Sequence, residues 1–330
     1  MGGDHGPSIT VPAALKFLGQ QSEVDIVLVG LEDQVMAAVQ AEQGKTYLDS
    51  GRLSIVHASE VVAMDEPPAL ALKKKKDSSM RVAINLVKEG AAHACVSAGN
   101  TGALMATARF VLKTIKGIDR PAIISTMPCQ DPSQTVHMLD LGANVDSTPE
   151  MLLQFAVMGS VLTQYVDKKE NPTVGLLNVG AEEIKGSEKV KKAAALLSNS
   201  ALNYVGYIES DELFTARVDV IVCDGFEGNV ALKASEGAAS MIFSVLNEEF
   251  KRSVLAKLAA SFALPVLRRI KARLDPRRHN GATLVGLNGI VVKSHGGTDA
   301  FGFLHALEEA SIQLQWDVVD HISSEIEISI

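Results

Sequence analysis

The residues best suited to chemistry form a short polar turn between an apolar run at 94–96 and an Ala/Leu-rich helical pattern. Gly99 and Gly102 allow the backbone to approach a bound group closely, because glycine has no Cβ. The free N–H groups and the dipole of the following helix favour negative charge at its first turn. The turn therefore suits a phosphate or an oxyanion, although a plain strand-to-helix turn capped by Asn100 or Thr101 is an equal alternative. The residues that we expect to contact such an anion are Ser97, Gly99, Asn100, Thr101 and Gly102.

Similar polar turns follow other apolar runs and supply amide, ammonium, carboxylate and imidazole groups. This inventory suits holding a tetrahedral anion and stabilising an oxyanion better than it suits attack by a serine or cysteine nucleophile. Each residue also has a structural alternative, since Asn often caps helices and Asp224 could simply form a turn before Gly225. Lys185 is the hardest to explain structurally, because its loop offers no apolar face to cover. The candidate residues at these turns are Asn144, Asn178, Lys185, Asp224, Asn229 and His295.

Common catalytic and nucleotide-binding motifs are absent from the sequence. There is no GxGxxG or GxxxxGK[ST] loop, no GxSxG turn, no HExxH helix and no cysteine pair at metal spacing. Asp140 and Asp146 could bind a metal, but no third ligand accompanies them. We therefore expect neither a metal nor a cofactor. We also expect the three cysteines to be reduced; they are Cys95, Cys129 and Cys223.

The composition indicates which elements position these turns. Hydrophobic residues make up 47% of the 330 residues, aromatic residues only 5%, and there are 26 glycines. This balance favours alternating strands and helices around a buried sheet, and the order strand, polar turn, helix repeats along the chain. We therefore predict an α/β fold with a parallel or mixed, doubly wound sheet, in which ligands bind at the carboxyl ends of the strands.

Apolar runs and helical periodicity locate the individual elements. One helix begins at Thr148 as the N-cap, with Pro149 in its first turn. The other expected helices span 7–18, 34–41, 70–76, 78–88 and 101–113, with one more at the carboxyl terminus. The expected strands are 24–29, 53–56, 94–96, 123–127, 136–141, 173–179, 203–209, 218–223 and 290–293.

Charge and hydropathy exclude several classes of protein. The net charge of −8 argues against a general nucleic-acid-binding protein. No apolar run reaches the roughly 18–20 residues needed to span a bilayer, and no signal peptide opens the chain. We therefore expect a cytoplasmic protein. Lys73 to Lys76 are four consecutive cations, which form either a solvated helix face or a docking patch for an anionic partner.

The segment 233–274 differs from the rest of the chain. Apolar residues recur at every fourth position from Ile242 to Phe262, and Pro265 then separates a second apolar stripe. Residues 251–278 contain nine Lys/Arg and one acidic residue, a local charge of +8. The pattern predicts a basic amphipathic helical hairpin over 230–275, which would contact a membrane surface, an anionic partner or a second subunit. The cations that we expect to dock a partner or a membrane are Lys73, Lys74, Arg268, Arg269 and Lys271.

Together, these motifs resemble the phosphate acyltransferase family known as PlsX. The resemblance extends over nearly the whole chain and is specific as a set. It is carried by MGGDHGP at Met1, SSMRVA at Ser78, CVSAGNTGALM at Cys95, GIDRPA at Gly117, DLGANVD at Asp140, MGSV at Met158, LLNVG at Leu176, CDGFEGNVALK at Cys223, NGA at Asn280 and KSHG at Lys293.

The resemblance implies an enzyme of bacterial phospholipid synthesis that transfers a fatty acyl group from acyl carrier protein to inorganic phosphate. It further implies the fold of isopropylmalate dehydrogenase and phosphotransacetylase, with one α/β lobe of residues 1–145 plus 290–330, a second of 146–289, and a homodimeric assembly. The acyl phosphate would serve a membrane-bound glycerol-3-phosphate acyltransferase, which would give the hairpin a role at the bilayer. The family also has a strand before the Met-Gly-Gly-Asp turn, and we expect this strand to be missing here.

The expected mechanism places phosphate at the 97–102 turn, with Lys185 supplying a cation. Direct attack of phosphate on the thioester carbonyl would form an oxyanion, met by backbone N–H groups and by Asn229 or Asn144. The candidates for orienting the substrates are Asp224 and His295.

Two other functions are alternatives to acyl transfer. A dehydrogenase of similar fold would need a nicotinamide site and a metal bound by acidic residues. A non-catalytic scaffold would dock acyl carrier protein to the membrane through the basic segments, with no phosphate-dependent cleavage of the thioester.

Overall fold

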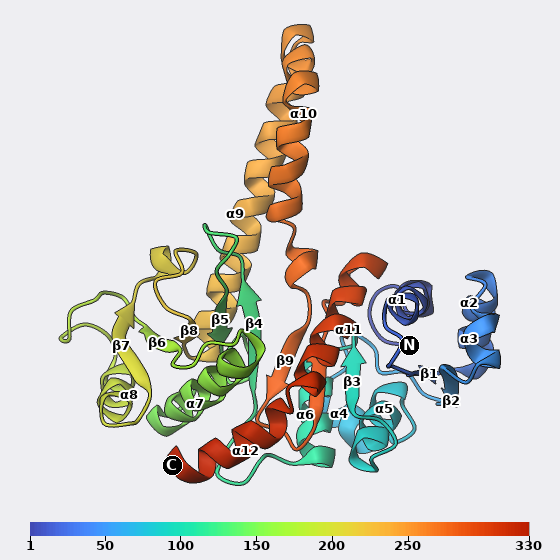
Figure 1. Ribbon diagram of the computed structural model, residues 1–330, viewed down its shortest axis with the longest axis horizontal. Helices are drawn as coiled ribbons and strands as arrows, with labels where there is room; N and C mark the ends of the chain where they lie inside the picture. The colour runs from blue at the N-terminus through green and yellow to red at the C-terminus, as the bar shows by residue number, and fades with distance from the viewer. Residues whose placement is uncertain (330) are drawn as a thin grey trace.

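The computed structural model describes residues 1–329 and contains an eight-stranded sheet, a two-stranded sheet and surrounding helices (Figure 1). The strands are β1 (Ile26–Gly30), β2 (Leu53–His57), β3 (Ala94–Ser97), β4 (Ala122–Met127), β5 (Val136–Leu139), β6 (Thr173–Leu177), β7 (Asn203–Ile208), β8 (Val220–Val222), β9 (Ala282–Val285) and β10 (Ile290–Lys293). The helices are α1 (Pro7–Gln20), α2 (Glu32–Ala41), α3 (Lys45–Asp49), α4 (Pro68–Lys74), α5 (Ser79–Lys88), α6 (Thr101–Leu112), α7 (Pro149–Val166), α8 (Glu188–Ser198), α9 (Gly225–Lys251), α10 (Val254–Arg273), α11 (Ala300–Gln315) and α12 (Val318–Ser329), with short 3₁₀ turns η1 (Ser210–Glu212) and η2 (Pro276–His279).

The large sheet has the order β3-β10-β9-β4-β5-β8-β6-β7 and is mixed. β3 and β10 are parallel, and β5, β8, β6 and β7 form a second parallel set. Antiparallel β9 and β4 join the two sets. The predicted α/β fold with a parallel or mixed sheet is therefore confirmed. This one sheet contains strands of both expected lobes, so it does not separate them. The division of the chain into those lobes stays a prediction.

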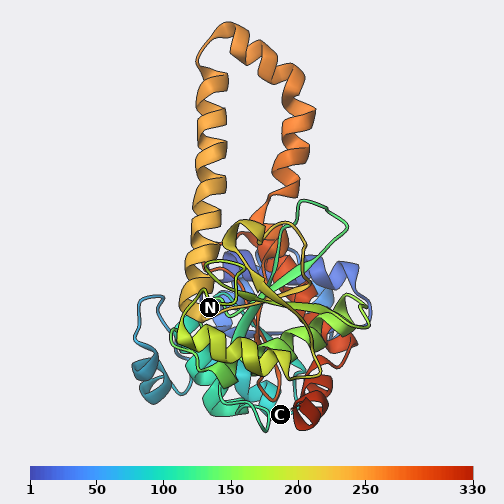
Figure 2. The same ribbon diagram turned by 90° about the vertical axis from the view of Figure 1, so that its left-hand side faces the viewer.

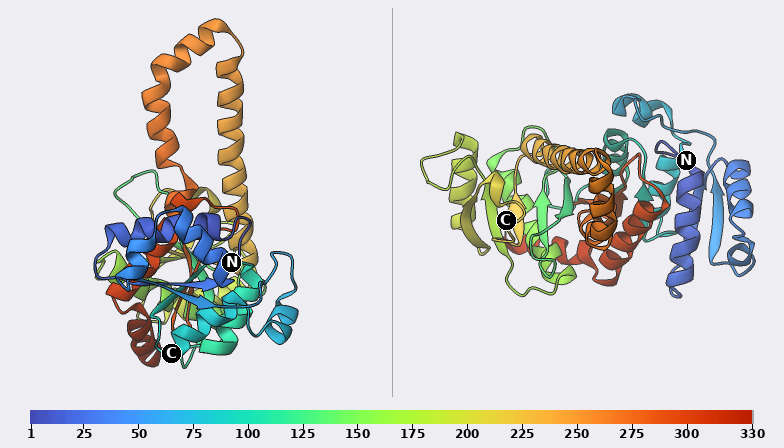
Figure 3. Two further views of the ribbon diagram at one scale, coloured as in Figure 1. Left: turned by 90° about the vertical axis from the view of Figure 1, so that its right-hand side faces the viewer. Right: turned by 90° about the horizontal axis from the view of Figure 1, so that it is seen from above.

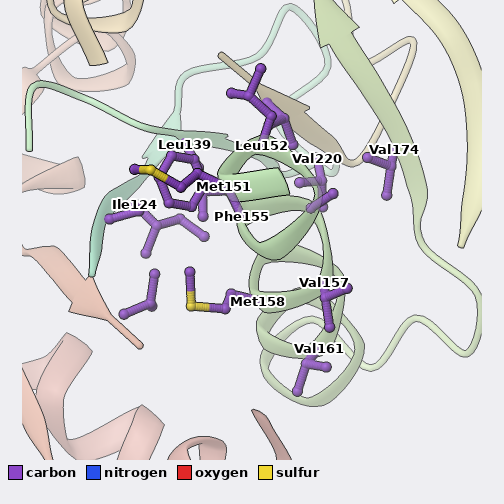
Figure 4. Close-up of a cluster of buried hydrophobic side chains, with 14 of the residues drawn as sticks. Ile124, Leu139, Met151, Leu152, Phe155, Val157, Met158, Val161, Val174 and Val220 are labelled. Carbon is purple, nitrogen blue, oxygen red and sulfur yellow. The ribbon is translucent and has the colours of Figure 1, made fainter. Parts of the chain in front are cut away.

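The largest hydrophobic core is organised by α7, which packs against one face of the sheet (Figure 4). Thr148 accepts a hydrogen bond from the N–H of Met151 at 3.3 Å, and Pro149 occupies the first turn, as predicted. Phe155 and Met158 are fully buried. Burial of each such side chain contributes roughly 1.5–3 kcal/mol, so α7 stabilises the strands whose carboxyl ends carry candidate site residues.

α9 and α10 form the predicted hairpin, which projects from the middle of the molecule (Figures 2 and 3). The expected break at Pro265 is wrong, because this proline lies inside α10. α9 ends at Lys251, and Ser253 begins the next helix by accepting a hydrogen bond from the N–H of Ala256 at 3.1 Å. The capping serine therefore sets the break, whereas the missing N–H of a single proline does not end this helix. Within residues 1–329, no helix has both the length and the apolar character needed to cross a bilayer.

Four other elements differ from the sequence-based expectation: β9, α3 and α8 were not expected, and the carboxyl-terminal helix is divided. β9 has four residues and lies between β10 and β4 with antiparallel pairing to both, and α3 has only five residues, which is less than two helical turns. The single helix expected at the carboxyl terminus is two helices, α11 and α12. They are separated at Trp316 and Asp317, and Asp317 has a φ of 44°, which a continuous right-handed helix does not allow.

A cavity of about 810 Å³ lies between β1 and β3 and is lined by residues of both strands. Within the described part of the chain, β1 pairs only with β2, and β3 pairs only with β10. The expected absence of a strand next to the amino-terminal turn concerns this region and stays a prediction.

Candidate active site

Three glycine-containing turns pack together just before α1, α6 and α11. We call them the glycine cradle, and they consist of residues 2–6, 97–102 and 294–297. The N–H of Asp4 donates to the carbonyl of Gly296 at 3.0 Å. A Cβ on Gly2 would lie 2.7 Å from the Cα of Gly99, so a larger residue would force the two backbones apart. Small residues thus bring three segments of backbone together at the ends of β3 and β10.

Asn100 is buried and is the N-cap of α6. Its Oδ1 accepts a hydrogen bond from the N–H of Ala103 at 3.0 Å, and its Nδ2 donates to the carbonyls of Met64 at 2.8 Å and Glu66 at 3.0 Å. These bonds hold the loop before α4 against the start of α6. The capping alternative is therefore confirmed for Asn100, and the groups left for an anion at this turn are the exposed Thr101 and the backbone.

The other predicted residues of the cradle have clear local roles. The Oγ of Ser97 accepts a hydrogen bond from the N–H of Gly99 at 3.2 Å. A Cβ on Gly102 would lie 2.7 Å from the side chain of Pro68, so this glycine permits α4 to approach α6. His295 is exposed, and its Nδ1 accepts from the N–H of Gly297 at 3.2 Å.

A second group, which we call the Asp224 cluster, lies at the carboxyl ends of β5, β6 and β8 and comprises Asp140, Asn144, Lys189, Asp224 and Asn229. Asp224 begins α9 by accepting from the N–H of Phe226 at 2.9 Å. It also accepts from the N–H of Ser147 at 2.7 Å and from the ammonium of Lys189 at 2.9 Å. Burial alone would raise the pKa of Asp224, but these donors hold that pKa below its ordinary value.

Lys189 is the part of this cluster that sequence reasoning missed. It lies in the first turn of α8 and forms ion pairs with Asp224 and, at 3.8 Å, with Asp146. A lysine in the first turn of a helix opposes the helix dipole, which is the sequence signal that could have identified it. Of the Asp140–Asp146 pair considered as metal ligands, Asp146 forms an ion pair with Lys189, whereas Asp140 accepts hydrogen bonds from backbone and side-chain amides.

Asp140 is a fully buried member of this cluster. Its carboxylate accepts hydrogen bonds from the N–H of Ile123 at 2.9 Å, of Ala143 at 3.0 Å and of Asn144 at 2.7 Å, and from the side-chain amide of Asn144 at 2.9 Å. Burial raises the pKa of Asp140, and these donors counteract part of the rise. Asn144 also donates to the carbonyl of Pro121 at 2.9 Å, so its side chain is occupied within the protein.

Asn229 and Lys185 are the members of the predicted set that are open to a ligand on this side. Asn229 is half-buried in α9, with its Oδ1 3.6 Å from the position of a Cβ on Gly142. Lys185 is exposed in the loop after β6. Asn178 supports that loop by donating to the carbonyls of Gly180 at 3.0 Å and Lys185 at 3.3 Å.

The cradle and the Asp224 cluster border the same hydrophobic cluster. This cluster contains Ile123 of β4 and Met138 of β5. Packed against it are Met105, one turn into α6, and Ala231 and Leu232, two turns into α9. The amino-terminal turns of α6 and α9 therefore lie on one face of the sheet, on either side of the central strands. The positive helix ends suit small anions. The hydrophobic cluster between them, which we call the apolar floor, suits an acyl group.

The cations expected to dock a partner are all exposed. Lys73 and Lys74 lie in the last turn of α4, and Arg268, Arg269 and Lys271 lie on α10. The hairpin also exposes large apolar side chains, including Leu255, Leu258 and Phe262, which are 78%, 56% and 81% exposed. The hairpin thus combines positive charge with uncovered apolar surface.

The comparisons with known proteins agree with this fold and identify the family. The chain is 55% identical over 327 residues to a protein named "Phosphate acyltransferase" from Legionella pneumophila, covering 99% of this chain and 94% of that protein. A protein of the same name from Alkalilimnicola ehrlichii is 56% identical with the same coverage. A phosphotransacetylase from Streptococcus pyogenes matches with a TM-score of 0.59, covering 98% of this chain and 92% of that chain at 17% identity, and therefore shares the fold.

The sequence profile of the family described as "Fatty acid synthesis protein" matches residues 1–321. With that match and the relatives above, the resemblance noted in the sequence is confirmed. The chain belongs to the fatty acid synthesis protein family.

Proposed function

We propose that this protein transfers a fatty acyl group from the thioester of acyl carrier protein to inorganic phosphate, forming acyl phosphate. The observation that carries the proposal is the placement of the α6 and α9 amino-terminal turns on one face of the sheet, in a chain whose relatives are named phosphate acyltransferases. One helix end would hold phosphate, and the other would stabilise the thioester oxyanion.

In the proposed reaction, a phosphate oxygen forms a bond to the thioester carbonyl carbon, and the carbon–sulfur bond then breaks. Phosphate is already anionic near pH 7 and needs little help from a base. The leaving thiol, with a pKa of roughly 8.5 if cysteine is a guide, needs little help from an acid. Orientation and oxyanion stabilisation are therefore the main tasks of the protein, which fits Asn229, Lys185 and backbone N–H groups better than a covalent nucleophile.

Replacing Lys185 with Ala tests the role of this exposed cation. We expect acyl phosphate formation at saturating acyl carrier protein thioester to fall by roughly tenfold to a hundredfold, because a charge-assisted contact to the substrate is lost. The product can be measured by trapping with hydroxylamine. Lys192→Ala, an exposed lysine on the neighbouring helix, is the matched control. Unchanged turnover and unchanged phosphate dependence in Lys185→Ala would remove this residue from the site.

We further propose that the protein is cytoplasmic and homodimeric, and that the hairpin brings it to the membrane where a glycerol-3-phosphate acyltransferase consumes the acyl phosphate. The positive charge of α10 would meet anionic lipid headgroups, and its exposed apolar side chains would enter the interface. Support for this role comes from the projection of the hairpin away from the sheet and the exposure of Leu258 and Phe262.

Replacing Leu258 with Glu tests the membrane contact. We expect flotation with liposomes of anionic phospholipid to fall about tenfold in partition coefficient, because one buried leucine contributes roughly 1.5 kcal/mol or more. Val205→Glu, a similarly exposed apolar position on β7, introduces the same charge away from the hairpin and should float like the parent protein. Equal flotation of both variants, with a lower molecular mass of Leu258→Glu in solution, would instead make the hairpin a dimer contact.

A further inference from the structure

Lys293 is the last residue of β10 and is only 8% exposed. It pairs in register with Ser97 of β3 and with Ala282 of β9, and Ala282 packs against the hydrophobic cluster between α6 and α9. Directly paired residues in a sheet share a face. The side chain of Lys293 is therefore on the face covered by α6, between the glycine cradle and the apolar floor.

The ammonium group of Lys293 lacks the partner that buried cations normally have. Lys75, Lys169 and Lys189 are less buried, and each has a carboxylate oxygen within 4 Å. Within residues 1–329, Lys293 has no such partner, and its Nζ donates to the carbonyl of Ser294. A buried charge without a counterion is costly, and an anion bound beside Lys293 would offset that cost.

The surroundings of Lys293 lack such a counterion at close range. Asp4, in the first turn of the cradle, is exposed and acts on Lys293 only from beyond ion-pair distance. Burial lowers the pKa of Lys293 to about 8, with Asp4 opposing the shift. A lysine held in this way binds a dianion strongly, because the ion pair restores the charge that burial disfavours.

We propose that Lys293 binds the inorganic phosphate that accepts the acyl group. The phosphate would lie between the glycine cradle and the hydrophobic cluster, next to the first turn of α6. The proposal rests on the proposed function and deepens it, because it assigns the principal cation of the phosphate site to a buried residue of β10 rather than to Lys185. The exposed Thr101 and the free N–H groups of α6 would complete the contacts to the phosphate oxygens.

Replacing Lys293 with Met, which keeps the apolar stem and removes the charge, tests the proposal. We expect the KM for phosphate to rise by roughly tenfold to a hundredfold, while the KM for the acyl carrier protein thioester stays within about threefold. Phosphate should also stabilise the wild-type protein against heat more than the same concentration of chloride does, and this effect should be lost in Lys293→Met. Lys293→Arg keeps the charge and should retain the thermal effect.

Lys169→Met is the matched control, because it removes a partly buried, ion-paired lysine at the amino-terminal side of β6. It should lower stability without changing the KM for phosphate. If Lys293→Met has the same KM for phosphate as the wild-type protein, and the wild-type protein carries out phosphate-dependent acyl transfer, the proposal is overturned and the proposed function stands. Absence of phosphate-dependent acyl transfer in the wild-type protein would instead overturn the proposed function.

Chemical labelling keeps the proposal testable if Lys293→Met does not fold. Acetylation of wild-type lysines, read by mass spectrometry, should be slowed several-fold at Lys293 by saturating inorganic phosphate and be unaffected at Lys169. Equal labelling of Lys293 with and without phosphate would overturn the proposal.

Discussion

Replacing Asp140 with Ala is expected to lower the free energy of unfolding by about 4 kcal/mol and to abolish activity. The carboxylate is fully buried and accepts four hydrogen bonds from Ile123, Ala143 and Asn144. Truncation removes the acceptor of three backbone N–H groups and one of the two acceptors of the Asn144 side-chain amide, and each unmet buried donor costs roughly 1–3 kcal/mol before relaxation. Chemical denaturation followed by circular dichroism measures the change directly.

The reason for the loss of activity is the position of this carboxylate. It joins the start of β4, through Ile123, to the turn after β5 that carries Asn144. The same turn contacts α9, because the N–H of Gly225 donates to the carbonyl of Asn144 at 2.9 Å. Without Asp140, the turn and the first residues of α9 would lose their common anchor.

Asp131 provides the control for this substitution. Its carboxylate is exposed and, among residues 1–329, accepts hydrogen bonds only from Ser133 in its own turn. Asp131→Ala should therefore change stability far less than Asp140→Ala. Similar denaturation midpoints for Asp140→Ala and the wild-type protein would show that the four donors find other partners, and the structural role given to Asp140 would be wrong.

The sequence predicted the elements that depend on local chemistry. Thr148 caps its helix as expected, and Asn100 caps α6, which was one of the two alternatives for its turn, because a short polar side chain before an apolar helical pattern can accept a bond from a free N–H group of the first turn. Most strands appear within a few residues of their expected bounds for the same local reason. β9 was not predictable in this way, because its pairing with β10 and β4 depends on tertiary structure. The continuation of α10 through Pro265 was not predictable either, because a proline usually ends a helix.

The candidate site was less predictable, because its charges are paired by residues distant in sequence. Asp224 meets Lys189 and the N–H of Ser147 only after three strands have come together. The inward orientation of Lys293 depends on its register with β3 and β9, which the sequence does not state. Residue types at the turns thus predict an anion site, whereas burial and strand pairing are the observations from which we propose Lys293 as its cation.

Replacing Gly228 with Ala is the second change with a large expected effect. A Cβ at this position would lie 1.9 Å from the carbonyl oxygen of Asp140 and 2.8 Å from the Sγ of Cys223. Both obstacles are buried, so the first turns of α9 must move away from β5. We expect stability to fall by about 3 kcal/mol. Turnover should fall roughly a hundredfold, because Asn229 moves with the helix.

Gly237, in the same helix, separates this steric effect from the effect of losing a glycine. Beyond its chain neighbours and the adjacent backbone of α9, no heavy atom of the described residues lies within 4 Å of a Cβ built at Gly237, so Gly237→Ala should raise stability by roughly 0.5–1 kcal/mol. Thermal unfolding of the two variants should thus shift in opposite directions. If Gly228→Ala unfolds and turns over like the wild-type protein, α9 does not need its close approach to Asp140. The start of this helix would then not position Asn229, and the oxyanion would have to be stabilised from the α6 side alone.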